Sequence, residues 1–232
     1  MVQHRPHTTV VLAMSADGKI ADLVRSPARF GSGADKAHLE KQIAASDAVV
    51  FGAGTLRTYG TTLTVSDPTL LQQRKRENKS PQPIHIVLSS SGNLNPDIKF
   101  FQQPVKRWLL TTTTGAIFWQ ERSEFERILV METSRGNIDT RAVWQHLVSL
   151  QIKDLAVLGG GEVVASLLAS DLIDEFWLTI CPLILGGTAA PTAVEGQGFV
   201  SDLAPRLQLL DVCTVEQEVF LHYRLQRSVG MD

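Results

Sequence analysis

Strand-like and helix-like patterns of apolar residues alternate along most of this chain. Short apolar runs rich in β-branched residues, the kind that form buried strands, occupy residues 8–15, 47–53, 83–89, 106–112, 127–131, 155–158 and 174–181. Apolar positions at helical spacing occur at residues 139–148 and 162–169, and a capping-box-like pair, Ser32 and Asp35, opens a helix to about residue 45. Repeated strand–helix units predict an α/β fold with a mostly parallel central sheet flanked by helices.

The last part of the chain has a different pattern. Residues 207–215 and 217–225 are two strand-like runs with almost nothing between them, which predicts an antiparallel C-terminal hairpin. This hairpin would make the sheet mixed. No linker, repeat or shift in composition divides the 232 residues, so we expect one domain over residues 1–232, with a core at about 8–226.

The apolar run LAVL at residues 155–158 ends in three consecutive glycines, Gly159, Gly160 and Gly161, directly before a helical pattern. Glycine has no Cβ, so a ligand can approach its backbone closely, and the helix that follows offers free N–H groups and the positive end of its dipole. This arrangement is typical of a phosphate site. The spacing is not that of the dinucleotide fingerprint, and a tight strand-to-helix turn without a ligand is the alternative.

Two further strands end in small or polar residues, at 15–18 (SADG) and 52–55 (GAGT). The carboxyl ends of parallel strands meet at one edge of a sheet, and ligands bind at this edge in open α/β folds. We therefore expect the three strand ends to converge on one site.

Composition narrows the partners and the compartment. With 44 % apolar residues, 20 % charged residues and a net charge of −2, the chain resembles a soluble globular protein and gives no reason to expect nucleic acid or a membrane as partner. The N-terminus lacks the apolar segment of a secretory signal, which predicts a cytoplasmic protein with Cys181 and Cys213 as reduced core thiols. The basic run at 74–79 is interpreted as a solvated loop, and the scattered histidines predict no metal site.

Four motifs occur in order along the chain: SADGKIA at 15–21, FGAGT at 51–55, LGGGEVVASLL at 158–168 and LIDEFWLTICPLILGG at 172–187. Together they resemble the reductase domain of riboflavin biosynthesis, the 5-amino-6-(5-phosphoribosylamino)uracil reductases, over about residues 8–225. The resemblance implies a dihydrofolate reductase-like fold, NADPH as hydride donor and a small-molecule substrate. The zinc deaminase domain that accompanies this reductase in the family has no counterpart here, so a stand-alone reductase is expected. Apolar residues at 176–178 and 180–185 predict the contact of a homodimer.

The resemblance also implies where the cofactor binds. Ala13 would line the nicotinamide side, Thr55 matches a small hydroxyl residue at the start of a short helix, and Ser90 falls at the adenosine end. The pyrophosphate would meet the glycine turn and the amides that follow it, at Gly159, Gly160, Gly161, Glu162, Val163 and Val164. The serines at 89–91 could donate to a 2′-phosphate and favour NADPH over NADH, although serines after a strand are as often only a turn.

On the substrate side, the family residue that matches Lys19 faces the substrate, and Lys19 would stabilise charge as hydride arrives. Asp17 is the second catalytic candidate, although fixing the loop geometry or pairing with Lys19 is the simpler role for it. Leu63 matches a substrate-binding position. A bend without a catalytic role is the alternative for the turn at Asp17 and Gly18.

Three polar positions of the family pattern are changed in this chain. Tyr59 replaces an aspartate near the cofactor, Ser66 an arginine that holds substrate, and Leu158 a glutamate before the glycine turn. Replacement positive charge could come from Arg25, Arg29 or Arg57. The leading substrate is the ribosylaminopyrimidine, another small carbonyl or pterin-like compound is the first alternative, and a nucleotide-binding protein without turnover is the second.

Overall fold

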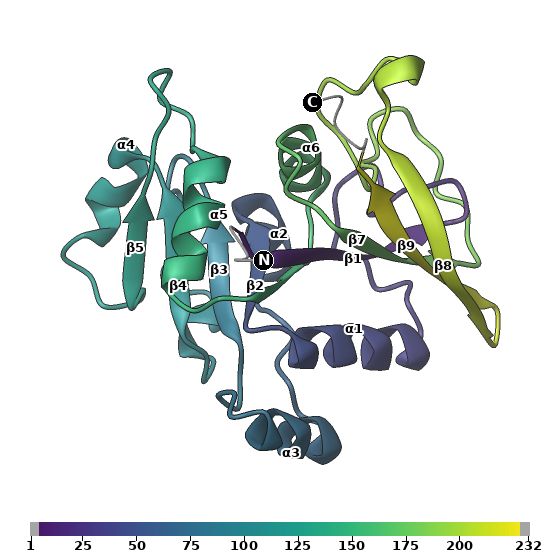
Figure 1. The fold of residues 1–232 in the computed structure, drawn as a ribbon, viewed down its shortest axis with the longest axis horizontal. Helices are drawn as coiled ribbons and strands as arrows, with labels where there is room; N and C mark the ends of the chain where they lie inside the picture. Colours follow the sequence, from purple (N-terminus) through teal and green to yellow (C-terminus); the bar gives the residue numbers. More distant parts are fainter. Residues whose placement is uncertain (1–4, 228–232) are drawn as a thin grey trace.

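The computed structural model describes residues 5–227, and within them one sheet has the strand order β5-β4-β3-β2-β6-β1-β7-β9-β8 (Figure 1). The strands are β1 (His7–Ser15), β2 (Ala48–Gly52), β3 (Ile84–Leu88), β4 (Arg107–Thr111), β5 (Arg127–Val130), β6 (Asp154–Val157), β7 (Glu175–Cys181), β8 (Arg206–Val215) and β9 (Glu218–Gln226). Neighbouring strands from β5 to β7 run parallel, and β9 pairs antiparallel with β7 and β8. The predicted α/β fold with an antiparallel C-terminal hairpin is confirmed.

Helices cover both faces of this sheet. One buried apolar cluster includes residues of α1 (Gly33–Ala45) and α2 (Ala53–Tyr59), and α3 (Pro68–Arg76) packs against it. The other cluster includes residues of α5 (Thr140–Ser149) and α6 (Gly161–Ala169). Figure 1 shows α1 and α3 below the sheet, on the side opposite α6. Shorter helical segments are α4 (Thr113–Ala116) and the 3-10 turns Lys99–Gln102, Ile117–Trp119 and Ser201–Leu203. No helix within residues 5–227 is long and apolar enough to cross a bilayer.

The start of α1 differs from the predicted capping box. Ser32 is the N-cap, and its hydroxyl accepts hydrogen bonds from the amides of Ala34 and Asp35. In a capping box the third helical residue returns a bond to the amide of the cap. Here the Ser32 amide donates to Glu218 Oε1 at 2.7 Å, from the first residue of β9. A residue far away in the sequence therefore completes the cap, and the Asp35 carboxyl is left for other contacts.

The basic run at 74–79 is not a simple loop, so that expectation is wrong. Its first residues form the last turn of α3, which begins at an Asp67 N-cap followed by Pro68, a helix-start signal that was overlooked. Arg74 is buried, and its guanidinium is satisfied there by hydrogen bonds of 2.7 Å that it donates to the carbonyls of Ala44 and Ser46 at the end of α1. The Arg74 guanidinium therefore links the end of α3 to the end of α1.

The prediction for one of the two cysteines is wrong, and the residues of the expected dimer contact differ in exposure. Cys181 is buried as predicted, but Cys213 is exposed because it lies on the edge strand β8. Phe176 belongs to the apolar core, and its strand β7 lies between β1 and β9. Phe176 is therefore not available to a second copy, whereas Ile184 of the same expected contact is 78 % exposed.

Candidate functional site

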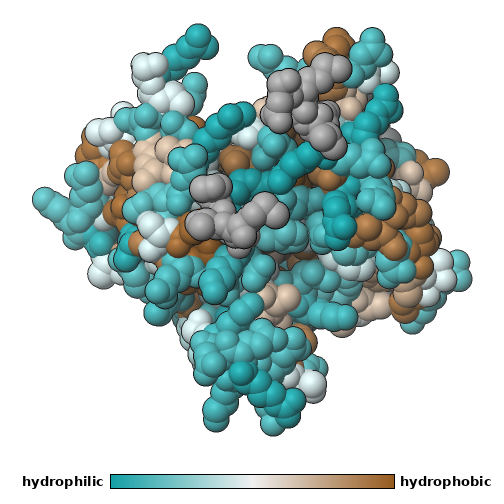
Figure 2. Space-filling model, viewed as in Figure 1, coloured by the Kyte–Doolittle hydropathy of each residue, from teal (hydrophilic) through white to brown (hydrophobic). Residues whose placement is uncertain are grey.

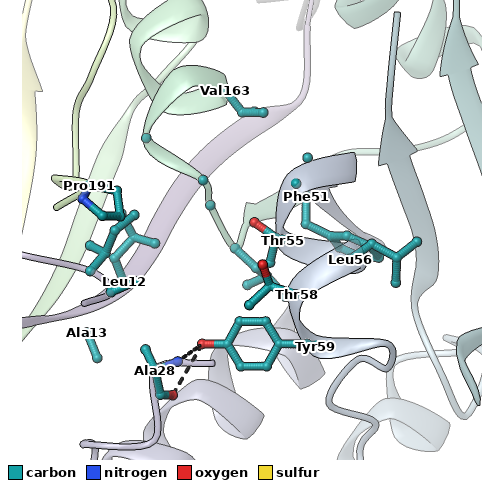
Figure 3. Close-up of a pocket in the computed structure, with 18 of the residues that line it drawn as sticks. Leu12, Ala13, Ala28, Phe51, Thr55, Leu56, Thr58, Tyr59, Val163 and Pro191 are labelled. Atoms are coloured by element: carbon teal, nitrogen blue, oxygen red, sulfur yellow. Dashed lines mark hydrogen bonds between the residues drawn. The ribbon is translucent and has the colours of Figure 1, made fainter. Parts of the chain in front are cut away.

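A cavity of about 800 Å³ lies at the carboxyl ends of β1, β2 and β6, where the motif-bearing strand ends converge as expected (Figure 3). Eight of the predicted residues line it: Ala13, Thr55, Leu63, Gly159, Gly160, Gly161, Glu162 and Val163. The other four predicted residues, Asp17, Lys19, Ser90 and Val164, do not belong to its lining. Tertiary structure therefore brings the predicted nicotinamide, pyrophosphate and Leu63 positions together and leaves the predicted catalytic pair outside.

The three glycines of the turn are needed for different reasons. Gly159 has a φ of 97°, in the left-handed region that favours glycine. A Cβ on Gly161 would meet the carbonyl oxygen of Thr192 at 2.3 Å, so close packing excludes a side chain. A Cβ on Gly160 would come only within 3.5 Å of Thr55 Oγ1, an ordinary contact across the cavity. The fold requires Gly159 and Gly161, whereas the bare backbone at Gly160 keeps the cavity open between the turn and Thr55.

The helix after the turn presents its N-terminus to the cavity. Gly160 is the N-cap of α6 and gives no side-chain hydrogen bond to the first turn, so the amides of residues 161–163 can donate to a ligand. The prediction for Val164 is wrong, because its amide already donates to Gly160 O at 3.1 Å and its side chain is fully buried. A bound pyrophosphate would thus find the first turn of α6 and the dipole of that helix.

Tyr59, which stands where the family pattern has an aspartate, connects the last turn of α2 to the loop over the cavity. Its hydroxyl accepts from the Ala28 amide at 2.8 Å and donates to the Ala28 carbonyl at 3.2 Å (Figure 3). Burial raises the pKa of the Tyr59 phenol, so this contact is neutral at physiological pH. A structural link replaces a charged contact at this position.

Of the three arginines considered as replacement charge, Arg25 and Arg57 line the cavity and Arg29 does not. Arg25 lies 3.6 Å from the carboxylate of Glu195, which is itself in the cavity wall. Arg57 donates at 3.0 Å to the carbonyl of Asn93, in the loop that follows β3. The cavity therefore carries cationic groups at two places that an anionic ligand could reach.

The other two changed positions have different surroundings. Ser66 lies outside the cavity lining, where its amide and hydroxyl donate to the Glu40 carboxylate. Leu158 lines the cavity just before the glycine turn and adds apolar surface there. Neither provides the charge that the family pattern has.

Asp17 and Lys19 connect the loop after β1 to the loop after β7. Asp17 accepts from Ser15 Oγ at 2.6 Å and from the amides of Leu185 and Gly186 at 3.1 and 2.7 Å. The hydrogen bond from Ser15, followed by those of the two amides, lowers the pKa of Asp17 to about 2, so it is ionised at neutral pH and holds no proton to donate. The Lys19 ammonium donates to the carbonyl of Ala190 at 3.2 Å.

The serine cluster after β3 is mostly engaged within its own loop. Ser89 Oγ accepts from the Gly92 amide at 3.1 Å, and Ser91 Oγ accepts from the Asn93 amide at 3.3 Å. Ser90 is exposed, and its carbonyl accepts from the Thr112 hydroxyl at 2.7 Å. Because Arg57 contacts the same loop, the guanidinium is the stronger candidate for a phosphate at the adenosine end.

Asp35 lines the cavity and was missed as a site residue in the sequence. The capping-box pattern assigns the Asp35 side chain to the Ser32 amide, but that amide donates to Glu218 instead. Within residues 5–227, no three His, Cys, Asp or Glu side chains gather as metal ligands. The polar groups in the cavity lining include backbone amides, Arg25 and Arg57, and the carboxyl groups of Asp35, Glu162 and Glu195.

A family model described as the RibD C-terminal domain matches residues 6–221. The chain belongs to this family. It is 28 % identical to the 2,5-diamino-6-ribosylamino-4(3H)-pyrimidinone 5′-phosphate reductase of Archaeoglobus fulgidus, over 84 % of this chain and 89 % of that protein. A protein of the same name from Methanothermobacter thermautotrophicus is 24 % identical, over 96 % of this chain and 99 % of its own. The names of these two relatives support an oxidoreductase. A relative from Escherichia coli, 26 % identical over 94 % of this chain and 59 % of that protein, is named the riboflavin biosynthesis protein RibD.

Solved structures agree with the fold. A pyrimidine reductase-like protein from Corynebacterium diphtheriae superposes with a TM-score of 0.81 at 21 % identity, over 96 % of this chain and 93 % of that one. Acinetobacter baumannii RibD gives a TM-score of 0.80 at 21 % identity, over 97 % of this chain but only 59 % of that longer chain. Dihydrofolate reductase from Enterococcus faecalis, solved with NADP(H), gives 0.51 at 15 % identity, with 95 % of this chain and 97 % of that one covered. The dihydrofolate reductase-like fold predicted from the motifs is confirmed.

Proposed function

We propose that this protein is an NADPH-dependent reductase that reduces a ribosylaminopyrimidine 5′-phosphate to the ribitylamino product. The observation that carries the proposal is the glycine turn at the N-terminus of α6, placed in the wall of the cavity where Ala13 and Leu63 also lie. The family and the names of the relatives supply the reaction class. The leading substrate is 5-amino-6-(5-phosphoribosylamino)uracil.

The backbone of the turn fits the pyrophosphate of a dinucleotide. First-turn amides of α6 would donate to its oxygens, and Gly160 would leave the space that a Cβ would otherwise take. Ala13, with its short side chain, would lie against the nicotinamide, and Thr55 would close the opposite side. When bound, the reduced nicotinamide supplies the hydride, and the chain supplies position and electrostatics.

Substrate recognition depends on the rest of the cavity. Leu63 would contact the substrate through its apolar side chain, and Arg25 or Arg57 would provide a positive charge for its phosphate. For Lys19 we retain the role of stabilising charge at the reacting carbon, which requires the ammonium to exchange its contact with Ala190 for one with substrate. The two relatives from archaea carry the name of the 2,5-diamino-pyrimidinone, which makes that compound the second substrate to assay.

Complementation tests the proposed pathway. A strain that requires riboflavin because it lacks its pyrimidine reductase should grow without riboflavin when it expresses this chain, and should fail to grow with the Gly160→Val variant. Growth with neither, although both proteins are present as folded chains, would contradict the proposed substrate. If the purified protein changes NADPH fluorescence but does not oxidise NADPH when any pyrimidine or pterin is added, a binding protein without turnover would be favoured.

We also infer a cytoplasmic homodimer, with the contact on the C-terminal hairpin. Apolar side chains of the edge strand β8 are exposed, with Leu209 and Val212 each 50 % accessible. Figure 2 shows apolar residues gathered over β8 and β9 at the right of the molecule. A second copy would cover this surface. Light scattering on the purified protein should give twice the mass of the 25.5 kDa chain, and a monomer would contradict the inference.

A further inference from the structure

Asp35 places a carboxyl group in the wall of the cavity on the side of β1 away from the glycine turn. The Thr179 hydroxyl of β7 hydrogen-bonds to this carboxyl, and Thr179 pairs in register with Ala13 of β1. The glycine turn follows β6, which lies on the other side of β1. Asp35 is therefore next to the position proposed for the nicotinamide and away from the proposed pyrophosphate site.

The carboxyl of Asp35 is not needed to build its helix. Ser32 caps α1, and both the amide and the hydroxyl of Ser32 donate to the Glu218 carboxylate, at 2.7 and 2.5 Å. Glu218 is 3 % exposed and so holds the first turn of α1 from inside the protein. A Cβ on Gly31 would lie 2.2 Å from Asp35 Oδ2, so glycine at that position leaves room for the carboxyl. Ser32 and Glu218 therefore fix the first turn of α1, and the Asp35 carboxyl takes no part in the cap.

The surroundings of Asp35 raise its pKa above the ordinary value for an aspartate. Burial and then the charge of Glu218 raise the pKa of Asp35, and together they outweigh the hydrogen bond from Thr179. A helix N-terminus usually favours an ionised acid in its first turn, so this direction is opposite to the common one. The other titratable groups that interact with Asp35 are neutral at physiological pH, because burial raises the pKa of Cys181 to about 12 and also raises that of the Tyr59 phenol. The surroundings of Asp35 therefore raise the pKa of a carboxyl group that lines the cavity.

Reduction of a ribosylamino group consumes one proton for each hydride. The hydride adds to C1′ of the sugar, the bond between C1′ and the ring oxygen breaks, and that oxygen takes up a proton to become a hydroxyl. The nicotinamide is oxidised and the sugar becomes a ribityl chain. We propose that Asp35 is the general acid that delivers this proton, an inference that rests on the proposed reductase function. Solvent then returns a proton to the carboxylate.

The test compares Asp35→Asn with Glu121→Gln, which removes an exposed carboxylate outside the cavity. Both full-length variants and the wild type are assayed for NADPH oxidation with each of the two pyrimidine phosphates across a range of pH. Loss of a general acid should lower kcat of Asp35→Asn by about a hundredfold or more, with the NADPH dissociation constant within about twofold of wild type. Glu121→Gln should match the wild type.

The pH profile and the stability separate catalysis from structure. Wild-type kcat should fall as pH rises through the raised pKa of Asp35, and the residual rate of Asp35→Asn should lack this decline. The thermal midpoint of Asp35→Asn should not fall, because the amide removes repulsion from Glu218 and can still accept from Thr179. A variant with kcat within about twofold of wild type, or one that loses NADPH affinity or thermal stability, would overturn the role of Asp35 alone. If the wild-type protein does not oxidise NADPH with either pyrimidine, the proposed function and this inference would both be overturned.

Discussion

The two walls of the cavity are built on different principles. On the wall formed by β2, β6 and α6, the groups that we propose to bind the cofactor are backbone amides, and their position follows from three glycines in a row. On the wall formed by α1 and the loops after β1 and β7, the groups are side chains. Their orientation depends on partners more than a hundred residues away, such as Thr179 for Asp35 and Glu195 for Arg25. A motif in the sequence therefore locates a backbone site more securely than it locates a catalytic side chain.

Substitution of Gly160 should give the largest effect. Gly160→Val places a branched side chain between the turn and Thr55, in space that the proposed pyrophosphate needs. NADPH affinity should fall by about a hundredfold or more, equivalent to about 2.7 kcal/mol, and circular dichroism should show the wild-type fold. Isothermal titration calorimetry measures the affinity. Wild-type affinity in the folded variant would remove the backbone site from this wall.

The second variant tests whether the Lys19 ammonium acts on the substrate. Lys19→Met keeps much of the apolar stem and removes the ammonium that contacts Ala190. If Lys19 moves to the substrate, turnover should fall by roughly two orders of magnitude with NADPH affinity intact, as for loss of one well-placed electrostatic group. Steady-state kinetics with cofactor titration measures both. Turnover within about twofold of wild type would restrict Lys19 to connecting the two loops.

Cofactor preference tests the adenosine end of the backbone wall. We expect NADPH to bind at least about tenfold more tightly than NADH, roughly 1.4 kcal/mol. Since Arg57 lies in the cavity wall and contacts the loop after β3, Arg57→Gln should remove most of this preference, and Ser90→Ala should change it less. Dissociation constants for both cofactors measure it. An Arg57→Gln protein that keeps the full preference would assign the 2′-phosphate to another group.

The smallest effects are on stability, and they should have opposite signs for Asp17, which lies outside the cavity lining, and for Asp35, which lines it. The lowered pKa of Asp17 means that its ionised form stabilises the fold above the usual pKa, and that this contribution is lost as pH falls toward about 2. The raised pKa of Asp35 means that its ionisation costs stability as pH rises above its usual value.

Thermal melts across pH measure both contributions. Asp17→Asn should melt below the wild type at neutral pH, with the difference shrinking in acid, whereas Asp35→Asn should melt at or above the wild type. Equal shifts for the two variants would contradict the distinction between a structural carboxylate and a functional acid.

Much of this molecule could be predicted from local pattern. The strands, α1, α5 and α6 follow from apolar periodicity and cap residues, and the convergence of three strand ends follows from parallel topology. The overlooked α3 had a readable signal in Asp67 and Pro68. Other features could not be predicted, because the contact of Glu218 with Ser32 and the burial of Arg74 against α1 arise only when distant segments pack. For the same reason Asp35 was not predicted as a site residue. The error at Val164 is local, because its amide is the first in α6 to donate within the helix, to Gly160.

The most direct test of the central claim is a single-turnover assay with purified protein, NADPH and 5-amino-6-(5-phosphoribosylamino)uracil, repeated with the 2,5-diamino-pyrimidinone phosphate. Absorbance follows NADPH, and mass spectrometry follows the sugar. We expect one ribitylamino product for each NADPH oxidised, with deuterium from labelled cofactor at C1′. If NADPH binds but is not oxidised when either pyrimidine is present, the proposed reductase function would be contradicted.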